Sequence, residues 1–97
     1  MTEERVRARV QIYGRVQGVA YRANTEETAN EHSVDGWVVN RDDGRVEAVF
    51  EGDRESVEEI IEWCHTGSPQ ASVDRVEVEW EEPEGTRGST FGGPGKD

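Results

Sequence analysis

Residues 14–22, with the sequence GRVQGVAYR, constrain this chain more than any other stretch, because they join a predicted strand to a segment that can be helical. Gly14 and Gly18 allow a tight turn with positive φ and a close approach of the backbone to a ligand. Such a turn can direct several backbone N–H groups to one point, where the dipole of a following helix also attracts an anion. Arg15 and Arg22 flank the turn, and a guanidinium group matches the oxygens of a phosphate. The stretch therefore predicts a phosphate-binding loop between a strand and a helix.

The same spacing also fits a plain glycine turn with two surface arginines, because a short glycine motif is weak support when it stands alone. The stretch is not a Walker loop, since no Gly-Lys-Ser/Thr sequence follows it. It also holds no cysteine or serine placed as a phosphate-accepting nucleophile. Other parts of the chain must decide between the two interpretations.

Three blocks of the sequence resemble the acylphosphatase family. The first is residues 14–22 itself, and the second is residues 36–46, where GWVVN is followed by a DG pair and a valine. The third is residues 67–76, which begin with GSP and continue with two spaced valines. The order and spacing of the blocks agree with the family over residues 5–82. Three matching blocks favour the phosphate-binding interpretation over a plain turn.

The resemblance implies an enzyme that hydrolyses the carboxyl–phosphate anhydride of acyl phosphates to a carboxylate and inorganic phosphate, with no metal and no other cofactor. Arg22 matches the family's catalytic arginine, which holds the phosphate, and Asn40 matches the asparagine that positions the attacking water. The backbone amides that match its phosphate cradle belong to Arg15, Val16, Gln17, Gly18, Val19 and Ala20. An amide side chain can orient water without ionising, and fixed donors around phosphoryl oxygens stabilise the charge of the transition state.

A non-catalytic module that binds phosphate or another small anion is the alternative function, because the expected fold serves regulatory and RNA-binding domains as well as enzymes. An RNA-binding domain would show paired aromatic residues on its central strands and a basic face. This sequence shows neither feature. Turnover of an acyl phosphate would distinguish the enzyme from the binding module.

The charge of the chain is strongly acidic, with 22 aspartates and glutamates against 11 lysines and arginines, for a net charge of −11. Ten of the basic residues are arginines, and Lys96 is the single lysine. Self-repulsion at this charge opposes compaction in dilute buffer, and molar salt screens it. We infer a halophilic cytoplasm, with an ordinary acidic protein as the alternative. The charge argues against nucleic acid as a partner, since phosphate backbones are bound by basic faces.

The length of 97 residues predicts one domain over residues 1–97 with a single core and a glycine-rich tail at 84–97. No apolar run is long enough for a membrane span, and the N-terminal residues lack the apolar region of a secretory signal. Cys64 is the only cysteine, so no internal disulfide can form. We therefore expect a cytoplasmic monomer whose partners are the acyl phosphate and inorganic phosphate, without a membrane or nucleic acid.

Hydrophobic periods predict four strands and the second helix, and the first helix follows from elimination and from the resemblance to the acylphosphatases. Together they give an α+β fold with the order β-α-β-β-α-β. The expected elements are a strand over 6–13, a helix over 22–32, a strand over 34–40, a strand over 46–52, a helix with apolar positions at 57, 60, 61 and 64, and a strand over 73–81. The arrangement is ferredoxin-like, with one mostly antiparallel sheet and both helices on one face. A fifth edge strand near Phe91 is left open.

Three further expectations follow from local patterns. Arg5, Arg7 and Arg9 alternate with apolar residues, so they should form an ion-pair ladder with glutamates of neighbouring strands on the open face of the sheet. Cys64 completes the apolar face of the second helix, so it should be a core residue without thiol reactivity. Asp53 should cap the N-terminus of that helix.

Overall fold

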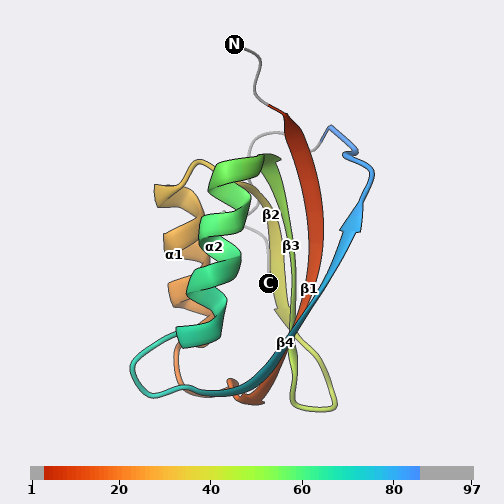
Figure 1. Ribbon diagram of the computed structural model, residues 1–97. Helices are drawn as coiled ribbons and strands as arrows, with labels where there is room; N and C mark the ends of the chain where they lie inside the picture. The colour runs from red at the N-terminus through yellow and green to blue at the C-terminus, as the bar shows by residue number, and fades with distance from the viewer. Residues whose placement is uncertain (1–3, 86–97) are drawn as a thin grey trace.

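The computed structural model describes residues 4–85, which form a four-stranded sheet covered on one face by two helices (Figure 1). The elements are β1 (Arg5–Arg15), α1 (Tyr21–Glu31), β2 (Asp35–Asn40), β3 (Val46–Asp53), α2 (Arg54–Thr66) and β4 (Ser72–Glu81). The strand order is β2-β3-β1-β4, and all three neighbouring pairs are antiparallel. The predicted α+β, ferredoxin-like arrangement is confirmed. The stretch near Phe91 lies outside the described residues.

The strand β1 lies inside the sheet because its side chains suit both faces. Val6, Ala8, Val10 and Ile12 are buried on the face that meets the helices. The alternating period of two sends the arginines between them to the opposite face. β1 pairs with β3 on one side and with β4 on the other, so it is the strand that joins the two halves of the sheet.

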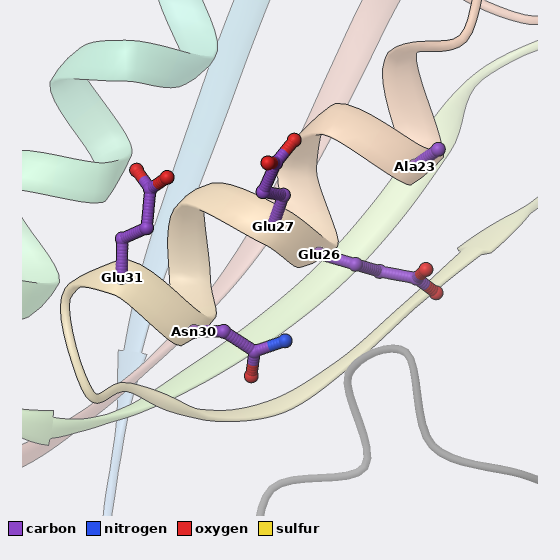
Figure 2. A pocket seen from close by; sticks show the side chains of 5 residues that line it. All are labelled: Ala23, Glu26, Glu27, Asn30 and Glu31. Atoms are coloured by element: carbon purple, nitrogen blue, oxygen red, sulfur yellow. The ribbon is translucent and has the colours of Figure 1, made fainter.

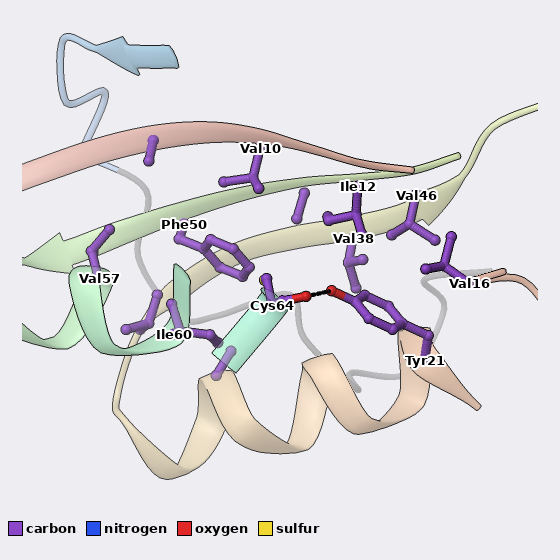
Figure 3. Packing of buried hydrophobic residues seen from close by; sticks show 14 of the residues in the cluster. Val10, Ile12, Val16, Tyr21, Val38, Val46, Phe50, Val57, Ile60 and Cys64 are labelled. Atoms are coloured by element: carbon purple, nitrogen blue, oxygen red, sulfur yellow. Dashed lines mark hydrogen bonds between the residues drawn. The ribbon is translucent and has the colours of Figure 1, made fainter. Parts of the chain in front are cut away.

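The core lies between the sheet and the helices (Figure 3). In α2, Val57, Ile60 and Cys64 are buried, which confirms the predicted apolar face and the core position of the cysteine. Burial raises the pKa of the Cys64 thiol to about 12, so the thiol stays neutral at physiological pH. Each large apolar side chain buried in this way contributes about 1.5–3 kcal/mol.

The buried stripe of α1 contains few apolar residues. Tyr21, Thr25 and Ala29 face the core at a spacing of four residues, whereas Ala23 is exposed. The helix begins at Tyr21, one residue earlier than predicted, and this brings the tyrosine ring into the core. Its hydroxyl donates a hydrogen bond of 2.8 Å to the backbone oxygen of Cys64, so one side chain links the two helices (Figure 3).

The arginines of β1 form the predicted ladder on the open face of the sheet. Arg5 binds Asp35 and Glu51, Arg7 binds Glu51 and Glu81, and Arg9 binds Glu47 and Glu81, all at 2.8–3.2 Å. The Glu51 side chain is fully buried and also accepts hydrogen bonds from the backbone N–H groups of Glu84 and Gly85. The ladder therefore joins β1 to both neighbouring strands and holds the chain that follows β4.

An irregularity in the pairing of β1 and β4 explains why β1 is longer than predicted. The register shifts between Tyr13 and Gly14, so Asp74 is the extra residue of β4 at that point. A Cβ at Gly14 would lie 2.3 Å from the backbone oxygen of Ser72, and its φ is 127°. The positive φ expected for Gly14 is present, and the close approach of β4 requires a glycine at this position.

The predicted cap of α2 is correct in position and wrong in chemistry. Asp53 occupies the N-cap position, but its side chain makes no capping bond to the helix amides. Its Oδ2 instead accepts a hydrogen bond of 3.1 Å from the hydroxyl of Ser56, in the first turn of the helix.

Candidate active site

The sequence-predicted site residues gather at one end of the sheet. β1 and β2 are both antiparallel to β3, so they run in the same direction and end at the same side, at the bottom of Figure 1. Val46 of β3 pairs with Ile12 of β1 and with Asn40 of β2. Asn40 thus lies two strands away from Ile12, at roughly 10 Å. The loop that follows β1 therefore begins close to the end of β2.

Residues 16–20 form the loop between β1 and α1, and we call this segment the cradle loop. Val16 is buried and anchors its start, whereas Gly18 and Ala20 are exposed. Gly18 has a φ of 74° with open space around it, and Ala20 has a φ of 62° and a ψ of 19°. A non-glycine residue in the left-handed region is strained, and such residues cluster at ligand sites. The strained backbone of the cradle loop is therefore typical of a segment that binds a ligand as well as connecting β1 to α1.

The side chain of Gln17 ties the cradle loop to the turn between β2 and β3. Its Nε2 donates to the backbone oxygen of Arg41 at 2.7 Å and to that of Arg45 at 2.9 Å. Both hydrogens of the amide are then in use. Because Arg41 directly follows Asn40, this tie fixes the distance between the loop and the end of β2.

Ser68 and Asn24 hold the other end of the cradle loop. The Ser68 hydroxyl donates a hydrogen bond of 2.7 Å to the backbone oxygen of Val19, and Ser68 is only 3% exposed. Asn24 donates to the backbone oxygen of Ala20 from its side chain at 2.8 Å and from its backbone at 3.0 Å. Sequence reasoning did not identify Ser68, Asn24 or the side chain of Gln17. The only signal for Ser68 is its place in the third block of the sequence.

The N-terminus of α1 is open to an anion. No side chain caps it, and its first turn contains no acidic residue although the whole chain has 22 of them. The first amides of a helix have no partner inside the helix and carry the positive end of the dipole. Arg22 is the second residue of α1, and its Nη1 lies 3.7 Å from a carboxylate oxygen of Glu26 one turn later. The loop, these amides and Arg22 are therefore consecutive in the chain and adjacent in space.

Asn40 ends β2 with an exposed side chain. The next residue, Arg41, binds Glu47 of β3 through two of its guanidinium nitrogens, each 2.6 Å from the carboxylate. This pair and the Gln17 tie fix the backbone on the C-terminal side of Asn40. The asparagine amide is thus carried by a rigid hairpin beside the cradle loop, where it can donate and accept hydrogen bonds.

An open hollow of about 470 Å³ lies on the outward face of α1, away from the core (Figure 2). Its lining residues are Ala23, Glu26, Glu27, Asn30 and Glu31. Three carboxylates repel an anion, so this hollow does not suit phosphate. Within residues 4–85, no group of three or more histidine, cysteine, aspartate or glutamate side chains is arranged to hold a metal ion.

The fold and the loop together define a small ferredoxin-like domain in which a strand, a strained loop and an open helix N-terminus meet at one end of the sheet. The family profile described as Acylphosphatase matches residues 8–92. The chain belongs to the acylphosphatase family.

Relatives and solved structures agree with this assignment. The acylphosphatase of Natronomonas pharaonis is 61% identical over 85 residues, which cover 88% of this chain and 92% of the relative. The acylphosphatase of Haloquadratum walsbyi is 60% identical over 88 residues, which cover 91% and 95%. The crystal structure of acylphosphatase from Bacillus subtilis has a TM-score of 0.81 and 36% identity, and the match covers 84% of this chain and 91% of that one. In the part of the chain that is described, neither helix has the length and apolar character that crossing a membrane requires.

Proposed function

We propose that this protein hydrolyses the carboxyl–phosphate anhydride of acyl phosphates to a carboxylate and inorganic phosphate. The observation that carries the proposal is the cradle loop, which leads directly into an uncapped and acid-free helix N-terminus with Arg22 as its second residue. Membership of the acylphosphatase family supports the same reaction.

The cradle loop binds the phosphoryl group in this proposal. Backbone N–H groups from Arg15 to Ala20 donate to the phosphoryl oxygens, and the guanidinium of Arg22 adds two donors in a fixed fork. Fixed donors stabilise the negative charge on these oxygens in the transition state without reorganising during the reaction. Arg22 and the loop therefore supply the electrostatic part of catalysis.

Asn40 orients the attacking water. The water oxygen forms a bond to phosphorus while the bond between phosphorus and the acyl oxygen breaks, and that electron pair leaves with the carboxylate. A carboxylate is stable at neutral pH, so its departure needs no proton. The proton released by the water goes to a phosphoryl oxygen, and the reaction as proposed uses no metal ion or other cofactor.

The setting of the reaction follows from the composition. We infer that the 97 residues work as one domain and as a monomer in a salt-rich cytoplasm, to which the net charge of −11 is suited. The same charge disfavours nucleic acid as a partner, so the acyl phosphate and inorganic phosphate are the molecules that the site handles.

The test of the proposal is an assay of the wild-type protein with benzoyl phosphate, in potassium chloride sufficient to keep the protein folded. We expect release of benzoate and phosphate, competitive inhibition by inorganic phosphate, and no loss of rate when a chelator is added. Phosphate binding without turnover would instead identify a non-catalytic anion-binding module. Loss of the rate with the chelator would show that the metal-free mechanism is wrong.

A further inference from the structure

The contact between Ser68 and the cradle loop joins two parts of the chain that lie 49 residues apart. Ser68 follows Gly67, which ends α2 with a φ of 70° and donates its N–H to the backbone oxygen of Trp63. A Cβ at Gly67 would lie 2.3 Å from the ring of Tyr21, so only glycine lets this segment come so close to the start of α1. The close approach brings the Ser68 hydroxyl within 2.7 Å of the Val19 oxygen.

This hydrogen bond sets the orientation of the peptide between Val19 and Ala20. The C=O and N–H of a trans peptide point in opposite directions, and residues 4–85 contain no cis peptide bond. Since the Val19 oxygen points inward to the buried Ser68, the N–H of Ala20 points outward. Ala20 is exposed, and we infer that its N–H, which lies on the side of the peptide opposite to Ser68, faces the open side of the cradle loop.

The strained conformation of Ala20 needs such a restraint. Alanine with a φ of 62° persists only where the surrounding structure holds it. The peptide before Ala20 is held by Ser68, and the peptide after it is held by the two hydrogen bonds from Asn24. Without the Ser68 bond, the first of these peptides can rotate and direct a carbonyl oxygen, which repels phosphate, towards the site.

We propose that Ser68 is a positioning residue whose hydroxyl holds the Val19 carbonyl so that the Ala20 N–H binds a phosphoryl oxygen. The inference rests on the proposed function and deepens it. It assigns the GSP sequence at residues 67–69 a task in substrate binding, although Ser68 itself does not touch the substrate.

The test compares Ser68→Ala with Ser56→Ala, a matched control. Ser56 also donates one hydroxyl hydrogen bond, to Asp53, at the N-terminal end of α2. The readouts are the inhibition constant of inorganic phosphate, kcat and KM with benzoyl phosphate, and the melting temperature. We expect Ser68→Ala to weaken phosphate binding about tenfold, the effect of one lost hydrogen bond, while Ser56→Ala leaves it unchanged. Ser68→Cys, with a weaker donor, should fall between the wild type and Ser68→Ala.

A titration of the wild-type protein with inorganic phosphate, followed by amide NMR, tests the inference without any variant. We expect the Ala20 N–H to show one of the largest downfield shifts. Shifts at Val16 to Val19 without a shift at Ala20, or equal phosphate binding by the two alanine variants, would overturn the role of Ser68 and leave the proposed function standing. A wild type that neither binds phosphate nor hydrolyses benzoyl phosphate would overturn the proposed function, and this inference with it.

Discussion

Arg22 and Asn40 have different duties in the proposed reaction, because one holds the phosphoryl group and the other holds the water. Arg22 lies in α1 and Asn40 lies at the end of β2. The side chain of Gln17 links the loop before Arg22 to the residue after Asn40. Substitutions at the two positions should therefore change different kinetic constants.

Arg22→Ala should abolish most of the turnover, and Arg22→Lys should not restore it. A lysine ammonium is a point charge, which cannot replace the planar fork of a guanidinium on two phosphoryl oxygens. The measurement is kcat/KM with benzoyl phosphate for both variants, with far-UV circular dichroism to verify folding. A lysine variant with nearly wild-type rates would contradict the assignment.

Asn40→Ala should lower kcat by about 100-fold, on the order of the loss of one donor that acts in the transition state. Competitive inhibition by inorganic phosphate should change little, because Asn40 holds the water and not the phosphate. Steady-state kinetics with phosphate as the inhibitor separates the two effects. A collapse of phosphate affinity would show that Asn40 is a binding residue.

The glycine loop could be nominated from local sequence, whereas Arg22 and Asn40 were nominated by the resemblance to the acylphosphatases, because Asn40 alone fits a strand-end turn residue. The sequence could not predict what the side chains of Gln17 and Ser68 do. Their partners are backbone oxygens 24 to 49 residues away, and any residue can supply a backbone oxygen. The burial of Tyr21 could not be predicted either, since it depends on whether α1 begins at residue 21 or at residue 22.

The ion-pair ladder on β1 makes the stability of the sheet depend on pH, because its carboxylates must be ionised to pair with the arginines. Burial disfavours the ionised form of Glu47, but hydrogen bonds from Gln11, Arg9 and Arg41 outweigh this cost and lower its pKa to about 2. The pKa of Glu51 is also lowered: burial again opposes ionisation, and hydrogen bonds from the backbone N–H of Glu84 and from Arg7 outweigh it. Both carboxylates therefore favour the folded state most where they are fully ionised.

The free energy of unfolding should consequently fall as the pH drops from about 4.5, the ordinary value for such a carboxyl, towards 2. A lowered pKa in the folded state gives stability that is complete above the unfolded value and lost on acidification. Urea unfolding between pH 6 and roughly 2 in constant salt measures the loss. Glu47→Gln should be less stable at neutral pH and should lose less over the acid range. An equally steep loss in that variant would show that Glu47 does not carry the effect.

The four strands and α2 were predictable because their apolar periods are clear, whereas α1 was predicted by elimination and by the resemblance to the family. The residues at which these elements begin and end were harder to predict. The C-terminal end of β1 depends on the bulge at Asp74 of β4, which reflects how two distant strands meet. The buried face of α1 consists of a tyrosine, a threonine and an alanine, and so weak an apolar pattern cannot define a helix face before the partner surface is known.

The net charge of −11 governs how the whole molecule responds to salt. Molar salt screens the repulsion among the carboxylates, so the melting temperature should rise with potassium chloride. The KM for an acyl phosphate should fall over the same range, because the long-range repulsion of the substrate anion is screened before the short hydrogen bonds of the cradle loop.

The measurement covers potassium chloride from dilute to molar, with KM taken only where the protein is folded. A matched variant replaces the exposed Glu62 and Glu79 by glutamine and should show a weaker salt dependence of the melting temperature. A melting temperature independent of salt would contradict the halophile inference. A KM that rises steadily with salt would show that local attraction governs substrate capture.

The position of β1 between β3 and β4 also determines when the sheet can form during synthesis of the chain. β1 leaves the ribosome before β4, yet Arg9 bonds to Glu81, which is made 72 residues later. At about 5–20 residues per second, β1 waits on the order of several seconds for its second neighbour. Until β4 is made, the edge of β1 that β4 covers is open, and the alternating arginines of β1 oppose pairing with other nascent chains there. We therefore expect the charges that later form the ladder to lower the tendency of the unfinished protein to aggregate.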